Sequence, residues 1–335
     1  MKTLTTIGSL PYKESEIACE KILKYTPELP AWPQLPKRNF KENMYVQYSE
    51  NFPGIILDET NQKIFVSTDK FYAELENFYK NYIDFNIDFF KISHNFAFGI
   101  YDLKKTINKN SKIKAQTTGP VTFGLSLKDE TGKSIFYIEQ MRDIVIKNCI
   151  MKSLWQLNFF ENNNLKVIFL DEPYLATYGS AFSGISKNDI IESINNVIKG
   201  IRENYKNDLL IGVHCCANTD WSILLQTDID ILSFDAYEFF DNFILYTDAI
   251  KNFIEKDNIL AWGIVPTQES TVKNVSIESL IEKFNKDIKL LLDKGFKKEK
   301  LLNNIIITPS CGLGTVTEET SEYVLQLTSE FINYI

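Results

Sequence analysis

Short apolar runs alternate along the chain with longer segments that have helical periodicity. The runs VIFLD, LLIGVH, DILSFD and NIIIT are almost entirely apolar, which is typical of strands buried on both faces of a parallel sheet. Eight strands are predicted, at residues 4–8, 88–92, 113–117, 167–171, 210–214, 231–235, 259–263 and 305–308. Helix-length segments lie between most of them, among them residues 135–160, 187–205, 276–293 and 318–335. This alternation predicts an α/β fold, a single (β/α)8 TIM barrel over residues 1–335, rather than an open doubly wound sheet.

One region, residues 26–70, breaks this alternation after the first strand. Four prolines, at positions 27, 30, 33 and 36, exclude a helix there. The run FPGIILDETNQKIFVST that follows predicts a β-hairpin that turns at residues 59–62. Long insertions in compact domains are usually functional. Residues 26–70 are therefore interpreted as an insertion over the C-terminal mouth of the barrel, either a lid or a docking surface for a partner; the alternative is a surface insertion without a function.

Charge and composition narrow the class of protein. The chain has 335 residues, of which 36 are basic and 44 acidic, so its net charge is −8, and no lysine and arginine cluster stands out. The net negative charge and the lack of a basic cluster argue against a nucleic-acid binder, because such proteins must neutralise phosphates. No signal peptide and no apolar stretch of about 18 residues is recognisable, so neither export nor a membrane span is expected. The five cysteines are accordingly expected in a reducing cytoplasm, where metal binding and catalysis are commoner than disulfides.

The predicted strands end in polar residues, and in a barrel all these ends converge on the face that carries the active site. The residues at these ends are Ser9, Thr118, Asp171, Glu172, His214, Cys216, Asp235, Thr267 and Cys311. The most informative group is HCC at 214–216, since in an extended chain its first and third side chains point to one side and Cys215 to the other. Cys311, in the glycine-containing loop PSCGLGT, adds a second thiolate to that side.

One histidine and two thiolates form a good ligand set for zinc, and three protein ligands leave a fourth position open for a substrate. Two anionic sulfurs weaken the metal as a Lewis acid toward water, whereas a thiol bound at the open position is deprotonated at neutral pH. The set therefore favours alkylation of a thiol over hydrolysis. The alternative for any free cysteine is an inert position in the core, and this is the interpretation for Cys19 and Cys149, which lie in helical patterns.

Two carboxylates and a second histidine are further candidates for substrate binding or catalysis. Asp171 and Glu172, in IFLDEPYL, are suited to bind a substrate ammonium group or to act as a general base. For Glu172 an ion pair with a neighbouring basic residue is the alternative. His94, in KISHNF, is more simply explained as a loop histidine than as a ligand or proton carrier.

The ordered motifs TTIGSLP, TTGPVTFG, IFLDEP, GVHCCAN, DIDILSFDA and PSCGLGT make the chain resemble a known family. It resembles the C-terminal catalytic barrel of cobalamin-independent methionine synthase in a short, single-barrel form. That family lies in a superfamily with methylcobamide:coenzyme M methyltransferases and uroporphyrinogen decarboxylase. The resemblance implies that His214, Cys216 and Cys311 hold a zinc ion that binds the acceptor thiol. It also implies that Ser9 contacts the amino acid substrate and that Asp171 binds its ammonium group.

The positions at which this sequence differs from the family lead to further predictions. Ser126 stands near the position of the tryptophan that stacks on the pterin in folate-dependent members, and no additional N-terminal barrel is recognisable. A methylated corrinoid protein, or methylcobalamin, is therefore the expected methyl donor. The resemblance places Asp235 as the fourth zinc ligand, with Glu238 as the alternative. Arg38 stands where the family has a second carboxylate for the homocysteine ammonium, which makes an anionic acceptor thiol an alternative.

The sequence therefore predicts a zinc-dependent methyltransferase that moves a methyl group from a methyl-corrinoid donor to a small thiol, with homocysteine favoured. The predicted substrate contacts are Ser9, Arg38, Thr118, Asp171 and Glu172, and the predicted catalytic residues are Asp171, His214, Cys216 and Cys311. Three alternatives remain: methyl transfer to an anionic thiol such as coenzyme M, a metal-free decarboxylase of the porphyrinogen type, and a non-catalytic protein that binds a corrinoid or another ligand.

Overall fold

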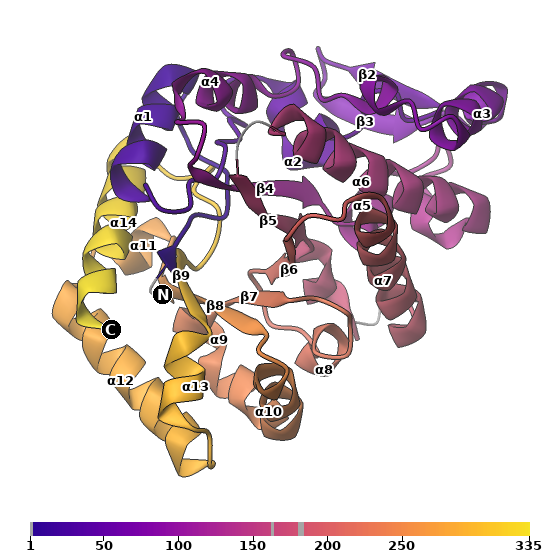
Figure 1. The fold of residues 1–335 in the computed structure, drawn as a ribbon. Helices are drawn as coiled ribbons and strands as arrows, with labels where there is room; N and C mark the ends of the chain where they lie inside the picture. The colour runs from indigo at the N-terminus through magenta and orange to yellow at the C-terminus, as the bar shows by residue number, and fades with distance from the viewer. Residues whose placement is uncertain (1–2, 162–163, 180–183) are drawn as a thin grey trace.

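A curled parallel sheet forms the centre of the molecule in the computed structural model, which describes residues 3–161, 164–179 and 184–335. Its strands are β1 (Thr3–Leu4), β4 (Lys112–Thr118), β5 (Asn164–Asp171), β6 (Leu210–Cys215), β7 (Ile231–Asp235), β8 (Ile259–Val265) and β9 (Ile305–Pro309). They follow the order β1-β9-β8-β7-β6-β5-β4, and every neighbouring pair is parallel. The sheet curls into a barrel surrounded by helices (Figure 1), which confirms the predicted α/β barrel fold.

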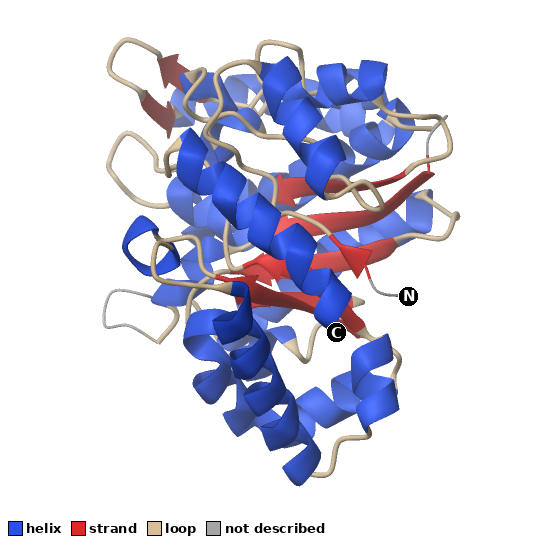
Figure 2. Ribbon diagram, turned by 90° about the vertical axis from the view of Figure 1, so that its left-hand side faces the viewer, coloured by secondary structure: helices blue, strands red, loops and turns tan. Residues whose placement is uncertain are grey.

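Helices cover the outer surface of this sheet (Figure 2). The four long segments predicted from periodicity are confirmed to within a few residues as α6 (Glu139–Phe159), α7 (Lys187–Asn204), α12 (Ile277–Asp293) and α14 (Glu318–Phe331). The remaining α-helices are α1 (Ser15–Tyr25), α2 (Met44–Gln47), α3 (Thr68–Ile83), α4 (Phe98–Thr106), α5 (Pro120–Ser126), α8 (Trp221–Leu224), α9 (Ala236–Phe243), α10 (Thr247–Glu255), α11 (Glu269–Val272) and α13 (Lys298–Asn303). Short 3-10 helices are η1 (Phe40–Glu42), η2 (Ile87–Phe90), η3 (Ile135–Tyr137), η4 (Pro173–Thr177), η5 (Ile244–Tyr246) and η6 (Ile332–Tyr334).

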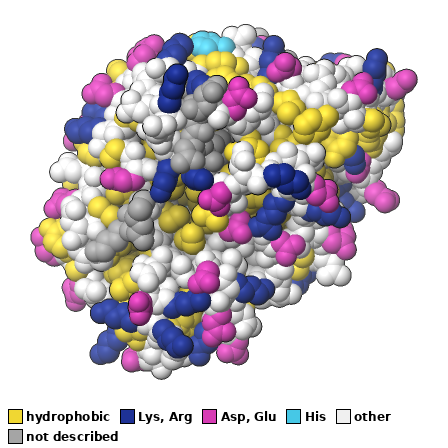
Figure 3. Space-filling model, viewed as in Figure 1, with side chains coloured by type: hydrophobic (Ala, Val, Ile, Leu, Met, Phe, Trp, Pro, Cys, Tyr) yellow, Lys and Arg dark blue, Asp and Glu magenta, His cyan; other side chains and the backbone are white. Residues whose placement is uncertain are grey.

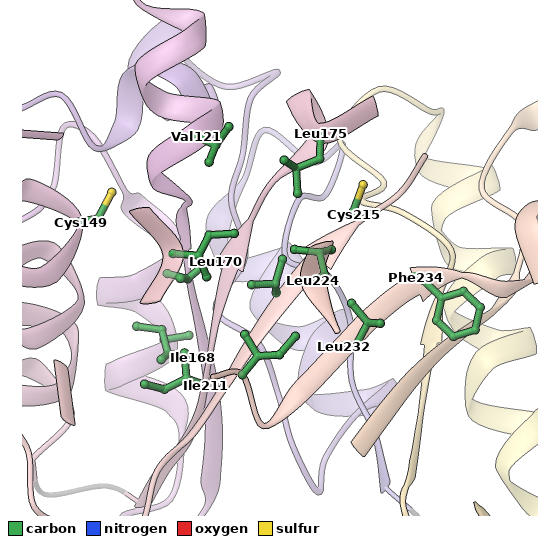
Figure 4. Packing of buried hydrophobic residues seen from close by; sticks show 14 of the residues in the cluster. Val121, Cys149, Ile168, Leu170, Leu175, Ile211, Cys215, Leu224, Leu232 and Phe234 are labelled. Atoms are coloured by element: carbon green, nitrogen blue, oxygen red, sulfur yellow. The ribbon is translucent and has the colours of Figure 1, made fainter. Parts of the chain in front are cut away.

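Apolar side chains fill both sides of the sheet. A small cluster lies apart from the main core and consists of Leu29, Val167, Phe169, Ile231, Ala261 and Ile306. The main core includes the other side chains of the same strands, and Figure 4 shows part of it. On the face seen in Figure 3, basic and acidic side chains interleave without a block of one sign. Among the helices of the described residues, none has the length and apolar character needed to cross a bilayer.

The prediction of a strand at residues 88–92 is wrong. This segment forms η2, and Phe90 packs edge to face against Phe78 of α3 with ring centroids 5.3 Å apart. Phe90 and Ile92 are both fully buried. Their apolar surface is thus buried against helices instead of within the sheet, and a short apolar run does not distinguish these two outcomes by its periodicity.

The proline-rich segment at residues 29–34 takes the place of that strand, and we call it the seam segment. It forms parallel bridges to both neighbours in the barrel wall. On one side the Lys114 amide of β4 donates to the Pro30 carbonyl over 2.9 Å, and on the other the Gln34 amide donates to the Gly8 carbonyl over 3.0 Å. Part of the predicted insertion therefore fills the gap between β1 and β4.

Side chains supply hydrogen bonds to the seam segment where its prolines interrupt the pairing of the backbone. Proline has no N–H group to donate to a neighbouring strand, so a regular ladder is interrupted. Instead the Trp32 indole N–H donates to Gln156 Oε1 over 2.9 Å, and Gln116 Nε2 donates to the Trp32 carbonyl over 2.8 Å. Gln34 Nε2 donates to Gln47 Oε1 over 2.8 Å. These side chains are all buried, so each hydrogen bond replaces one that water would otherwise supply.

The hairpin predicted after the prolines is confirmed. Strands β2 (Ile55–Asp58) and β3 (Lys63–Val66) pair in antiparallel register, and Gln62 in the turn between them has a left-handed φ of 51°. The hairpin lies at the edge of the molecule (Figure 2). The Val66 amide donates to the Lys128 carbonyl over 2.8 Å, which attaches the hairpin to the loop after α5. Its role as a lid stays a prediction.

Replacing Gln156 by leucine tests the hydrogen bonds of the seam segment. The substitution removes the acceptor of the Trp32 indole N–H and a donor to the Gln116 carbonyl. A buried polar group without a partner costs about 1–3 kcal/mol, so Gln156→Leu should lower the free energy of unfolding by about 2–4 kcal/mol. Urea denaturation followed by circular dichroism measures this change.

Gln226→Leu is the matched control, because Gln226 is exposed and donates to the Ser222 carbonyl four residues earlier. It should change the free energy of unfolding by less than about 0.5 kcal/mol. Equal stability of the two variants would contradict the role given to the buried amides.

Candidate metal centre

Three side chains from distant parts of the sequence meet at the C-terminal end of the barrel. His214 lies in β6, Cys216 follows that strand directly, and Cys311 lies in the loop after β9. Their ligand atoms, one imidazole nitrogen and two sulfurs, lie within 4.8 Å of one another. The structure thus brings together the three residues predicted as zinc ligands, at distances that suit a shared metal ion.

The orientation of His214 fits the role of a ligand. Its Nδ1 lies 2.9 Å from the Ser233 hydroxyl of β7, and its side chain is 3% exposed. Its Nε2 is buried and has no hydrogen-bond partner among the described residues. Because buried polar atoms are nearly always paired, this nitrogen is one that a metal ion would satisfy. The contact with Ser233 fixes the ring in the manner of the outer-sphere partners of metal-binding histidines.

The two thiols are coupled to each other. A hydrogen bond from the Cys311 thiol, opposed by burial and aided by His214, lowers the pKa of Cys216 to about 4. The same interaction raises the pKa of Cys311. In the metal-free protein at neutral pH the pair therefore holds a thiolate on Cys216 and a thiol on Cys311. Thiolate is the form of cysteine that binds zinc.

The other cysteines belong to the core. Cys215 is fully buried, and Figure 4 shows it among apolar side chains. Burial raises the pKa of both Cys215 and Cys19 to about 12, and it also raises the pKa of Cys149 well above its usual value. Protonated, buried thiols are inert. The alternation of side chains in the extended segment thus separates Cys215 from Cys216, as predicted.

A cavity of about 400 Å³ lies beside the two sulfurs. Its walls come from the segments that follow β7, β8 and β9, and include Asp235, Glu238, Thr267, Gln268, Glu269 and Ser310 together with Cys216 and Cys311. The size suits a small molecule, and three carboxylates make the wall acidic.

The two residues predicted as the fourth zinc ligand lie in this cavity. Asp235 Oδ1 accepts from the Glu238 amide over 2.9 Å and so caps α9. Burial raises the pKa of Asp235 to about 6. Among the described residues, neither carboxylate belongs to the group whose ligand atoms all lie within 4.8 Å. A role for Asp235 or Glu238 as fourth ligand stays a prediction.

Asp171 lies next to the ligand group. It ends β5 opposite His214 in the register of the sheet, and its side chain is 5% exposed. Its Oδ1 is buried without a hydrogen-bond partner among the described residues. Burial raises its pKa to about 6, against the lowering effect of Lys114 and His214. A free, buried carboxylate oxygen at this position is suited to a cationic group on a ligand.

Lys114 is a charged neighbour of this site that the sequence analysis missed. Its Nζ donates to the Ile7 carbonyl over 2.8 Å and to Gln116 Oε1 over 3.3 Å, and the side chain is fully buried. Burial lowers its pKa to about 8, and the charge of Asp171 opposes this effect. The available signal was a lysine between two apolar residues in the strand IKAQTT.

Ser9 lies against the loop that carries Cys311. The Leu313 amide donates to the Ser9 carbonyl over 2.8 Å, and Ser9 Oγ lies 3.4 Å from Gln34 Oε1. A Cβ atom at Gly312 would lie 3.1 Å from the Ser9 Cβ, and one at Gly314 would lie 3.2 Å from it. The glycines of PSCGLGT therefore allow this close contact. The structure places Ser9 beside the loop that carries Cys311, and its contact with a substrate stays a prediction.

Two predicted substrate contacts have other partners. Glu172 accepts hydrogen bonds from the Val121 amide over 3.0 Å and the Thr122 amide over 2.6 Å, so it caps α5. Thr118 Oγ1 donates to the Met44 carbonyl over 2.7 Å and ties the end of β4 to α2. These contacts position neighbouring segments, and the ion pair considered for Glu172 is not among them.

Arg38 is also engaged away from the three ligands. Its Nε lies 3.2 Å from Glu42 Oε1, and its guanidinium carbon lies 3.4 Å above the Phe98 ring. Glu42 is fully buried, so the ion pair anchors η1. His94 is exposed and packs on the same Phe98 ring at 3.9 Å, which agrees with its interpretation as a loop histidine.

Two tyrosines at the C-terminal end of the barrel were not identified from the sequence. Tyr45 of α2 and Tyr174 of η4 pack edge to face with ring centroids 5.9 Å apart. Burial, followed by the charges of Tyr174, Cys216 and Cys311, raises the pKa of Tyr45 to about 12. An aromatic residue in a loop-rich stretch gives no signal of this position in the sequence.

A curated methionine synthase is similar to this chain in sequence. No family model matches the chain. The chain is 26% identical over 215 residues to a methionine synthase of Methanocaldococcus jannaschii. The match covers 63% of this chain and 61% of the relative, so the chain aligns with about three fifths of that protein's length.

Solved structures share the fold over nearly the whole chain. A B12-independent methionine synthase from Shewanella sp. W3-18-1, in complex with selenomethionine, has a TM-score of 0.60 and 13% identity and covers 98% of this chain and 97% of its own. A putative vitamin-B12 independent methionine synthase from Listeria monocytogenes has a TM-score of 0.55 and 16% identity, covering 96% and 85%. A methyltransferase from Methanosarcina mazei has a TM-score of 0.56 and 13% identity, covering 98% and 94%. The resemblance predicted from the motifs is confirmed: the chain is similar in sequence to a methionine synthase, and it shares the fold of B12-independent methionine synthases.

Proposed function

We propose that the protein is a zinc-dependent methyltransferase that methylates a small thiol, with homocysteine as the acceptor and methionine as the product. One observation carries this proposal: the buried, unpartnered Nε2 of His214 meets the sulfurs of Cys216 and Cys311. The donor set of one imidazole and two thiolates fits zinc and leaves room for a further ligand. The homology to methionine synthase supports the same reaction.

The residues of the chain have separate tasks in this reaction. His214, Cys216 and Cys311 would hold a zinc ion, which would supply the charge that keeps an acceptor thiol deprotonated at neutral pH. Asp171 binds the acceptor's ammonium group through its free Oδ1, and Ser9 borders the acceptor on the side of the Cys311 loop. The acceptor sulfur then forms a bond to the methyl carbon as the bond from that carbon to the donor breaks, and the donor leaves with the electron pair.

The charges around the site favour homocysteine over an anionic thiol such as coenzyme M. The cavity beside the sulfurs is lined by Asp235, Glu238 and Glu269, and a sulfonate there would meet like charges. Arg38, the residue that made an anionic acceptor an alternative, is paired with Glu42. The same acidic wall disfavours a porphyrinogen-type decarboxylase, whose substrate carries several carboxylates.

The sequence analysis and the structural relatives differ on the methyl donor. The expected methyl-corrinoid, and with it a corrinoid protein as partner, gains no support from structural relatives whose names describe them as B12-independent. Methylcobalamin and methyltetrahydrofolate are therefore compared directly as donors. Methyl transfer from either one to homocysteine supports the proposed reaction, and its absence with both would leave the ligand-binding alternative.

The zinc site is tested by metal content. Wild-type protein purified without chelators should contain about one zinc per chain by elemental analysis, and Cys311→Ser should lose it, because serine is a poor zinc ligand. Cys215→Ser is the matched control, since it makes the same change at the adjacent core cysteine and should keep the zinc. Wild-type protein without zinc would contradict the proposed mechanism.

The role of Asp171 is tested by the choice of acceptor. Asp171→Asn keeps the size of the side chain but removes its charge, so KM for homocysteine should rise roughly ten-fold or more. KM for 3-mercaptopropionate, which lacks an ammonium group, should stay nearly unchanged, as should zinc content. An equal rise for both thiols would show that Asp171 does not bind the ammonium group.

A further inference from the structure

We propose that Cys216 and Cys311 form a redox-sensitive switch at the candidate metal centre. In the metal-free protein an oxidant such as hydrogen peroxide joins their two sulfurs in a disulfide, and a thiol reductant reopens it. This inference rests on the proposed zinc site and concerns the regulation of that site. It begins from the difference between these two cysteines and the other three of the chain.

Cys216 and Cys311 are the cysteines that a dissolved oxidant can reach. Both are partly exposed, and both line the cavity of about 400 Å³. The other three cysteines, Cys19, Cys149 and Cys215, are buried, and Figure 4 shows two of them among apolar side chains of the core. Oxidation of a cysteine depends on such access. Of the five cysteines, all of which the structure describes, these two are therefore the ones exposed to attack.

The two sulfurs are close enough to meet after small movements of their side chains. They belong to the group whose ligand atoms all lie within 4.8 Å of one another, and the two thiol groups hydrogen-bond to each other. A disulfide requires a sulfur–sulfur distance of about 2.05 Å. Cys216 directly follows β6 and Cys311 lies in the loop after β9, so rotation of these side chains breaks no pairing of the sheet.

Cys215 does not compete for this bond, although it is adjacent in sequence. Its side chain is fully buried, and its Sγ donates to the Ala217 carbonyl over 3.4 Å. Because neighbouring side chains of an extended segment point to opposite sides, the sulfurs of Cys215 and Cys216 lie on different sides of the backbone. The fold therefore selects Cys311 as the partner of Cys216.

The reaction with peroxide is balanced within the pair. One sulfur attacks a peroxide oxygen and becomes a sulfenic acid as the first water leaves, and the other sulfur then displaces the second water to form the disulfide. The two thiols are oxidised and the peroxide is reduced to two waters. Thiol–disulfide exchange with a reductant reverses the step. The disulfide withdraws two of the three candidate ligands, so it and a bound metal ion exclude each other.

Counting thiols tests the switch without any measurement of activity. Metal-free, reduced protein should lose two of its five thiols after treatment with hydrogen peroxide, counted with a chromogenic thiol reagent in guanidinium chloride. Mass spectrometry of an unreduced digest should find Cys216 linked to Cys311. The oxidised protein should bind no zinc until dithiothreitol is added, and protein loaded with zinc beforehand should keep its thiols.

Two serine variants serve as controls. Cys311→Ser should form no disulfide under the same treatment, whereas Cys215→Ser, the same change in the core, should form it like wild type. An unchanged thiol count in metal-free wild type, or a bond between Cys215 and Cys216, would overturn the inference and leave the proposed function standing. If reduced wild type binds no zinc, the proposed function fails, and the thiol count still shows whether the disulfide forms.

Discussion

Hydrogen bonds from buried glutamine side chains close the barrel at the place where its wall contains prolines. A parallel barrel has no free edge only if every strand pairs with two neighbours. The seam segment cannot do so through its backbone alone, because Pro30 and Pro33 lack N–H groups. Gln116 and Gln156 supply the missing donors and acceptors through their side chains. The rest of the fold depends on this closure, since it fixes β1 against β4.

The same closure determines the geometry of the site. Gln34 bridges Gly8 and Leu10 with its backbone, so it holds Ser9 from both sides. The Ser9 carbonyl in turn accepts from Leu313, two residues after Cys311. One of the two sulfurs is therefore positioned by a chain of hydrogen bonds that begins in the seam segment, whereas the other is positioned by β6. The candidate metal centre joins parts of the barrel that the sequence keeps nearly a hundred residues apart.

The charge pattern around this centre supports the acceptor proposed for it. Asp171 and Asp235 are buried carboxylates whose pKa values are raised by burial. The Cys216 thiolate adds further negative charge, and a divalent cation together with a ligand's ammonium group would compensate it. Lys114, held by the Ile7 carbonyl, contributes the opposite charge from the protein side. These charges fit the zwitterionic acceptor and the metal ion of the proposed function.

The sequence by itself determined the elements whose side chains follow a regular period. Its apolar runs and motifs predicted the barrel, its main helices, and the meeting of His214, Cys216 and Cys311 at the strand ends, because parallel strands bring their C-terminal ends to one face. It did not predict that the prolines lie in the barrel wall, since that depends on glutamine side chains from α6 and β4. It also did not predict that Arg38 pairs with Glu42 or that Glu172 caps α5, and it did not identify the buried Lys114 near Asp171. Those assignments depend on which partner is nearest in space, and only the tertiary structure decides that.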